Sequence, residues 1–301
     1  MTRKRAVALG ILLAEIIILV LYSPGEDFVA YYSAAHNGYS TSAFLYPVSM
    51  LVLVYPIAWL PFRVAYLVWV TAMYTVFGMS LWLWKRDWDW VLWGLACTLV
   101  WVCMCVGQVT PLIALLMALA YRAGGGFWSG FLLGLGAIKP HLVMWTGPAI
   151  FLRGKWKMLL GWCVGVGLVM LPSLPAMGSS GRDWVEIVSY FMRNPYSIAI
   201  CRWVGTPVWA FVIILAGVWW FKQEEIKERE LAMGLILSLW LGINLWEYDL
   251  ILLAPAVLYL GGEYLAWSFA TIHLFWHNPL PLVVGVLWLL ATGCFTSPEA
   301  I

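Results

Sequence analysis

Two adjacent carboxylates, Glu26 and Asp27, follow a Pro24-Gly25 pair near the start of the chain. Proline and glycine end a preceding helix, and acidic residues favour the first turn of a new one because of the helix dipole. The sequence therefore predicts that a helix begins at this point. A carboxylate held in that turn could act as a general base and take a proton from a hydroxyl group.

Aromatic residues continue this predicted helix at helical spacing. Phe28, Tyr31 and Tyr32 fall on one side of it and give it an amphipathic face suited to the boundary between water and lipid. Asp27 is then expected to lie at a membrane surface. An enzyme that acts on a lipid-linked substrate needs its base there, and Tyr31 and Tyr32 are candidates to bind the sugar or phosphate of such a substrate.

A second candidate is Lys139-Pro140-His141, which interrupts an apolar stretch. A charged side chain in such a segment costs about 2.5–3.5 kcal/mol on insertion scales, which makes a functional role the expected reason for its presence. We expect Lys139 and His141 to line a wet cavity, with the lysine as a point charge for a phosphate. The alternative is that Lys139 snorkels to the lipid headgroups.

Two further polar groups interrupt apolar runs. Gln108, between Gly107 and Pro111, offers a donor and an acceptor for a sugar or phosphate, although a simple loop explains it equally well. Glu247, Tyr248 and Asp249 either face the same cavity as Asp27 or form an interfacial turn.

The longest polar connection, about 173–203, supplies arginines. One of Arg182, Arg193 and Arg202 could grip a phosphate, or all three could be partly solvated. The histidines lack metal-ligand spacing, and no HExxH, GxSxG, Walker or Rossmann pattern occurs in a suitable context. We therefore predict neither a metal nor a cofactor.

The composition indicates which kind of secondary structure must position these residues. Of 301 residues 63% are hydrophobic and 11% charged, against about 25% charged in soluble domains, so the chain is predicted to be an integral membrane protein. The charge of +2 and the lack of a basic run exclude nucleic-acid binding. About 9–12 transmembrane or half-membrane helices are expected in a single polytopic domain, 1–301. The longer apolar runs are 6–22, 44–61, 64–84, 89–107, 156–172, 204–221, 230–246 and 279–295, and the shorter ones are 109–121, 127–138, 140–152, 248–260 and 264–276.

Basic turns at 153–157 and 222–229 are expected to be cytoplasmic. That places the first loop, 23–45, and the loop 173–203 outside the cell membrane. Three apparent spans then separate Asp27 from Gln108. Either Gln108 is cytoplasmic and 127–152 is one kinked span, or one segment is re-entrant and Gln108 faces outward with Asp27.

The order of these motifs resembles the GT-C glycosyltransferases of family 87, relatives of the polyprenol-phosphate-mannose-dependent α-mannosyltransferases. The resemblance covers about 25–260. It is carried by Asp27-Phe28, Tyr31-Tyr32, Ala34-Ala35, Tyr46-Pro47, Leu60-Pro61 with Ala65 and Trp69, Gly107-Gln108, Gly130, Gly134-Leu135-Gly136, Lys139-Pro140, Arg153-Gly154-Lys155-Trp156, Tyr248-Asp249-Leu250 and Leu252-Leu253-Ala254-Pro255.

The resemblance implies a GT-C-like bundle with an extracytoplasmic active site in the plasma membrane. It implies a polyprenyl-phosphate sugar as donor, a lipid or glycan hydroxyl as acceptor, and Asp27 as the base. One base acting alone indicates inversion at the anomeric carbon. A transporter or flippase of lipid-linked saccharides remains the alternative, although the chain shows no repeated halves; a structural subunit would leave Asp27 and Lys139 unexplained.

Overall fold

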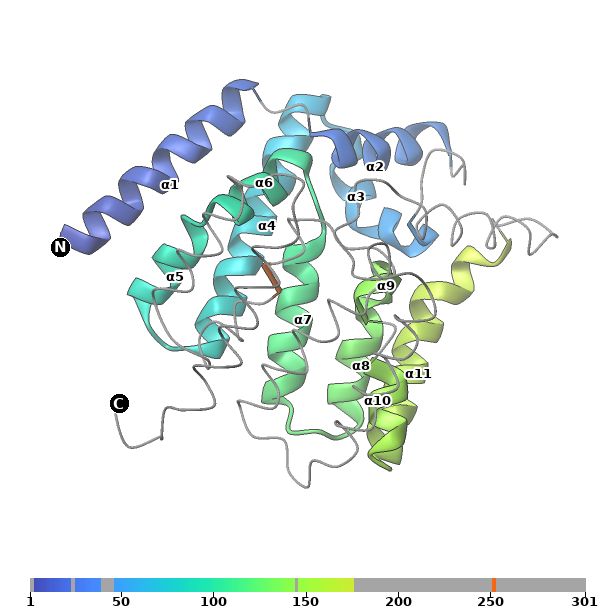
Figure 1. Ribbon diagram of the computed structural model, residues 1–301. Helices are drawn as coiled ribbons and strands as arrows, with labels where there is room; N and C mark the ends of the chain where they lie inside the picture. Colours follow the sequence, from blue (N-terminus) through green and yellow to red (C-terminus); the bar gives the residue numbers. More distant parts are fainter. Residues whose placement is uncertain (1–2, 23–24, 39–45, 144–145, 176–250, 253–301) are drawn as a thin grey trace, which may run out of the picture.

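The computed structural model describes residues 3–22, 25–38, 46–143, 146–175 and 251–252, and in this part of the chain helices joined by short turns are the only regular elements (Figure 1). The α-helices are α1 (Arg3–Tyr22), α2 (Glu26–Asn37), α3 (Leu51–Ala58), α4 (Phe62–Trp84), α5 (Trp88–Leu95), α6 (Thr98–Val106), α7 (Thr110–Arg122), α8 (Phe127–Leu135), α9 (Pro140–Val143), α10 (Thr146–Leu152) and α11 (Trp156–Met170). Short 3₁₀ helices occupy Val48–Met50, Gly136–Ile138 and Leu171–Ser173.

Two of these helices, α4 and α11 with its 3₁₀ extension, are long and apolar enough to cross a membrane, and the number is four if two bent helix pairs each count as one span. The predicted helix start after Gly25 is confirmed, because α2 begins at Glu26 and is bent by 48° from α1. The predicted span 89–107 is instead broken into α5 and α6, which are bent by 56°. The fold is a membrane helical bundle.

The predicted span 44–61 is wrong as a crossing. Its apolar helix, Val48–Ala58, is about 16 Å long at 1.5 Å per residue, whereas the hydrocarbon core of a bilayer is about 30 Å thick. Pro56 lies inside α3, and a new helix starts after Pro61. Consequently α2, α3 and the start of α4 gather at one end of the bundle, the upper end in Figure 1; we call it the Asp27 end.

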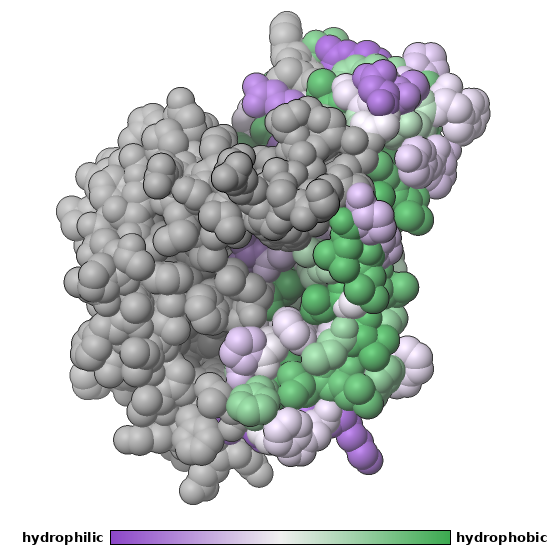
Figure 2. Space-filling view, turned by 90° about the vertical axis from the view of Figure 1, so that its right-hand side faces the viewer, coloured by the Kyte–Doolittle hydropathy of each residue, from purple (hydrophilic) through white to green (hydrophobic). Residues whose placement is uncertain are grey.

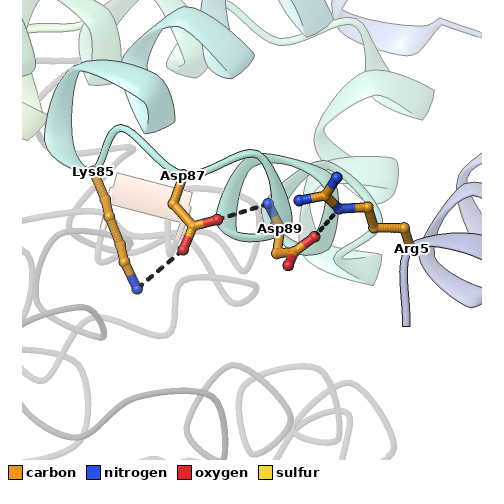
Figure 3. Close-up of polar contacts among 4 residues, drawn as sticks. All are labelled: Arg5, Lys85, Asp87 and Asp89. Atoms are coloured by element: carbon orange, nitrogen blue, oxygen red, sulfur yellow. Dashed lines mark hydrogen bonds and ion pairs between the residues drawn. The ribbon is translucent and has the colours of Figure 1, made fainter. Parts of the chain in front are cut away.

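The opposite end, here called the basic end, collects the positive charges. Arg5 of α1 donates through Nε to Asp89 Oδ1, beside the Lys85–Asp87 ion pair of 3.5 Å (Figure 3). Asp87 Oδ1 also accepts from the Asp89 N–H, which caps α5. Burial alone would raise the pKa of Asp87, but the N–H groups of Asp89 and Trp90 together with Lys85 outweigh it and lower that pKa. These contacts fix the start of α1 to the start of α5.

Helices α4 and α7 run in the same direction, from the Asp27 end to the basic end. Arg122 at the end of α7 donates through Nε to Leu83 O at 2.8 Å, and the rings of Trp84 and Tyr121 lie 4.8 Å apart. Since α5 and α6 return between them, Gln108 comes back to the Asp27 end. Gln108 therefore lies at the same end as Asp27, and the alternative that places the two residues on opposite sides does not fit this topology.

Residues 127–152 form a hairpin rather than one kinked span. Helices α8 and α11 lie parallel and unusually close: a Cβ added to Gly130 would meet Met158 O at 1.7 Å, and one added to Gly161 would meet Phe127 O at 2.0 Å. Helix α10, which follows in sequence, leads back beside α11: Trp162 Nε1 donates to Thr146 Oγ1 at 2.9 Å at the start of α10, and the rings of Phe151 and Trp156 lie 5.4 Å apart at its end. The hairpin thus enters and leaves at the basic end, with its apex at Lys139-Pro140.

Helix α11 then returns the chain to the Asp27 end. The Val48 N–H donates to Ser173 Oγ at 2.8 Å, and Ser49 Oγ donates to Val169 O at 2.9 Å. The outer side of α11 exposes an apolar stripe at helical spacing, Trp156, Leu160, Val164 and Leu168. Figure 2, seen from this side, shows hydrophobic colour over the middle of the face and hydrophilic colour mainly towards its upper and lower ends, as expected for a surface in lipid.

The close α8–α11 contact gives a stability prediction. Gly161→Ala should push the two helices apart and destabilise the protein by about 1–3 kcal/mol, as overpacking does. Gly167→Ala on the same helix is the control, because its Cβ would meet nothing closer than a Leu171 methyl at 3.8 Å. Thermal unfolding in detergent measures both. Equal melting temperatures would show that α8 and α11 are not in backbone contact.

The topology is testable by thiol labelling. In a background without the native cysteines, cysteines at the exposed positions Asn37 and Trp59 should react with an impermeant reagent from one side, because α3 does not cross. A cysteine at Arg86 should react only from the other side. Labelling of Asn37 and Trp59 from opposite sides would make α3 a span and refute this arrangement.

Candidate functional site

Asp27 lies in the first turn of α2, and a glycine makes that turn possible. Gly25, at the N-cap, has φ +63°, and its N–H donates to Cys105 O at 3.2 Å. A Cβ at this position would meet the ring of Tyr66 at 2.8 Å. The backbone before Asp27 is thus pinned against α6 and α4. One helical step separates the two carboxylates, so that Glu26 is exposed while Asp27 is half-buried and faces the protein.

Gln108 is the direct partner of Asp27. Its side chain is 1% exposed, and its Nε2 donates to Asp27 Oδ2 across 81 residues of sequence. Gln108 Oε1 accepts from the hydroxyl of Tyr46 at 3.2 Å. The amide therefore joins the helix that carries Asp27 to the segment that precedes α3.

Gln108 lies in the turn 107–109 between α6 and α7, here called the corner, which approaches α2 most closely at Gly107. This glycine has φ +79°, and a Cβ on it would lie 2.6 Å from the Cβ of Phe28, the neighbour of Asp27. Trp69 of α4 fixes the same corner, because its Nε1 donates to Gly107 O at 2.9 Å. Trp69 lies seven residues into α4, so the corner is recessed by about 10 Å from the start of that helix.

Lys139 reaches the same corner from the hairpin. It is 2% exposed, and its Nζ donates to Thr110 Oγ1 at 2.9 Å. The alternative in which Lys139 snorkels to the headgroups is wrong for this structure, because its ammonium is held inside the protein. Asp27 and Lys139, far apart in sequence, are therefore both bound to the three-residue segment 108–110.

The aromatic residues of α2 support this site more than they face lipid. Phe28 and Tyr31 are fully buried, and the ring of Tyr31 lies 5.9 Å from that of Trp69 and 5.0 Å from that of Tyr46. The prediction that they face the water–lipid boundary is therefore wrong; α4 covers them instead. Tyr32 donates from its hydroxyl to Leu60 O at 2.7 Å and so fixes the turn before α4. Sugar contacts by either tyrosine stay a prediction.

The remaining predicted residues divide into two groups. His141 is half-buried in α9, two residues beyond Lys139. Arg182, Arg193, Arg202, Glu247, Tyr248 and Asp249 lie outside the described residues. Ile251 and Leu252, which follow that last cluster, are buried in the same hydrophobic core as Phe28 and Trp69. Within the described ranges no group of three His, Cys, Asp or Glu side chains could hold a metal ion.

Sequence reasoning gave no role to Tyr46 or Thr110. Thr110 stands two positions after Gln108 in the same motif, which is the only signal that would have pointed to it. Tyr46 belongs to the Tyr46-Pro47 motif of the resemblance, but nothing in the sequence pairs it with Gln108, because that contact depends on how the segment before α3 folds back. The arrangement can offer a base at Asp27 and a cation at Lys139, both recessed at one end of a membrane bundle.

A family model described as glycosyltransferase family 87 matches residues 44–298. The matched range contains Tyr46, Gln108 and Lys139, whereas Asp27 precedes it. No curated protein and no solved structure matches the chain.

The Lys139–Thr110 bond gives a prediction that does not depend on any activity. Thr110→Val keeps the shape of a fully buried side chain but removes one acceptor of the ammonium, which should cost about 1–3 kcal/mol of stability. Thr110→Ser keeps the hydroxyl and should lose much less. Thermal unfolding of the two variants in detergent compares them. A Thr110→Val protein as stable as Thr110→Ser would mean that the bond is not maintained in solution.

Proposed function

Because the chain belongs to glycosyltransferase family 87, we propose that it transfers a hexose, mannose in the first instance, from a polyprenyl-phosphate donor to a lipid or glycan hydroxyl. The observation that carries the proposal is the attachment of Asp27 and Lys139 to one short segment, 108–110. A base and a cation in one recessed site are what transfer from a sugar phosphate to a hydroxyl needs. The family assignment favours transfer over the alternative of transport.

The proposed chemistry is a single displacement. The acceptor oxygen attacks the anomeric carbon while Asp27 takes its proton, and the bond from that carbon to the phosphate oxygen breaks with its electron pair on the phosphate. Lys139 stabilises the charge that gathers there, aided in this proposal by His141 and an arginine from 182, 193 or 202. Attack opposite the leaving group inverts the anomeric centre. The proposal includes no metal or cofactor, because Asp27 takes the proton and Lys139 stabilises the phosphate. The lipid-linked sugar is a co-substrate.

The proposed site is extracytoplasmic, in the plasma membrane, and the charge distribution supports this orientation. The cytoplasmic side of a membrane protein carries an excess of lysine and arginine close to the helix ends. At the basic end lie Arg3, Lys4, Arg5, Lys85, Arg86, Arg122, Arg153, Lys155 and Lys157. At the Asp27 end the described loops and helix starts contribute Arg63 alone, apart from the buried Lys139. Asp27 would then face a donor presented in the outer leaflet.

Asp27→Asn tests the proposal most simply. Asparagine keeps an oxygen that can accept from Gln108, so the local structure should survive, but it cannot take the acceptor's proton. Transfer from radiolabelled polyprenyl-phosphate mannose to extracted cell lipids should fall by about 10²–10⁴-fold in membranes that contain this variant.

Glu26→Gln is the matched control, because Glu26 is the neighbouring carboxylate but is exposed. It should retain near-normal transfer. Equal activity of wild type and Asp27→Asn would remove Asp27 as the base. A wild-type protein that moves no sugar from any polyprenyl-phosphate donor would overturn the proposed function itself.

A further inference from the structure

We propose that Tyr46 and Gln108 form a positioning relay for the base: Tyr46 fixes the orientation of the Gln108 amide, which in turn holds the Asp27 carboxylate. The inference rests on the proposed function and deepens it. Gln108 is thereby given a role towards the base rather than the donor.

The relay follows from the two unlike ends of a carboxamide. The Gln108 side chain has hydrogen-bond donors on Nε2 and an acceptor at Oε1. A rotation of 180° about its last side-chain bond exchanges the positions of these two atoms. Nε2 facing Asp27 makes a charge-assisted hydrogen bond, whereas Oε1 facing the same carboxylate would repel it. The orientation of one amide therefore decides whether the base is held or pushed away.

Tyr46 selects the favourable orientation. Its hydroxyl donates to Gln108 Oε1 at 3.2 Å, which leaves Nε2 pointed at Asp27 Oδ2. With Gln108 1% exposed, bulk water is not at hand to replace that bond. A hydroxyl at Tyr46 thus acts on Asp27 without touching it.

The rings around Tyr46 keep the relay rigid. Its ring meets that of Tyr31 edge-on, with centroids 5.0 Å apart and planes at 89°, and Tyr31 lies in turn 5.9 Å from Trp69. Trp69 also holds the backbone just before Gln108, through Gly107 O. Both residues of the Tyr46–Gln108 hydrogen bond are therefore held in place by the same helix, α4, through Trp69. A fully buried Tyr31 acts here as a support for Tyr46.

A double-mutant cycle on kcat and KM tests the relay. Tyr46→Phe keeps the ring and removes one neutral hydrogen bond, so kcat should fall about 3- to 10-fold with little change in KM for the acceptor or the donor. Gln108→Leu removes the bond to the carboxylate, and kcat should fall about 10- to 100-fold. The double variant should match Gln108→Leu, because Tyr46 acts only through Gln108.

Tyr55→Phe is the control, since it removes the same hydroxyl from an exposed side chain of nearby α3 and should change nothing. Thermal unfolding of each variant separates lost positioning from lost folding. Single effects that multiply in the double variant would overturn the relay, as would a rise in KM alone for Tyr46→Phe, which would place Tyr46 on a substrate. Absence of transfer by wild type is a different result, because it would overturn the proposed function together with this role.

Discussion

The hydrogen bond between Gln108 and Asp27 is the contact on which the site depends, because it joins the first helix after α1 to a corner 81 residues away. That corner can approach only because Gly107 has no Cβ, which would lie 2.6 Å from Phe28. Trp69 then fixes the carbonyl of Gly107, and Thr110 receives Lys139. Short polar contacts at one corner therefore set the relative positions of a carboxylate and an ammonium that belong to separate parts of the fold.

The rest of the bundle brings Lys139 to this corner. Lipid supplies no hydrophobic force between helices, so close packing through small residues must hold them together. Gly130 and Gly161 provide it between α8 and α11, where backbones touch. The hairpin 127–152 is thereby held with its apex inside the protein. A buried lysine is costly in a membrane, and the bond to Thr110 offsets part of that cost.

Local signals in the sequence were sufficient for several features and insufficient for others. Pro24-Gly25 followed by two acidic residues predicted the start of α2, and the isolated charge at Lys139 singled out the hairpin apex. Hydropathy predicts 44–61 as a span because it measures apolar length and not where a helix ends; α3 ends at Ala58, and α4 begins after Pro61. The spacing of the aromatic residues correctly predicts that they share one side of α2. Whether lipid or protein covers Phe28 depends on the position of α4, which the spacing does not show. Neither the Gln108–Asp27 contact nor the role of Tyr46 could be predicted, since both depend on tertiary folding.

The most direct test of the account is a structure of the protein bound to a non-cleavable polyprenyl-phosphonate sugar, determined by electron cryo-microscopy with an antibody fragment. The account predicts that the phosphonate lies beside Lys139, that the anomeric carbon faces Asp27, and that Gln108 still joins Asp27 to Tyr46. A donor bound with its phosphonate at the basic end, or at the Asp27 end but out of reach of both Lys139 and Asp27, would contradict it.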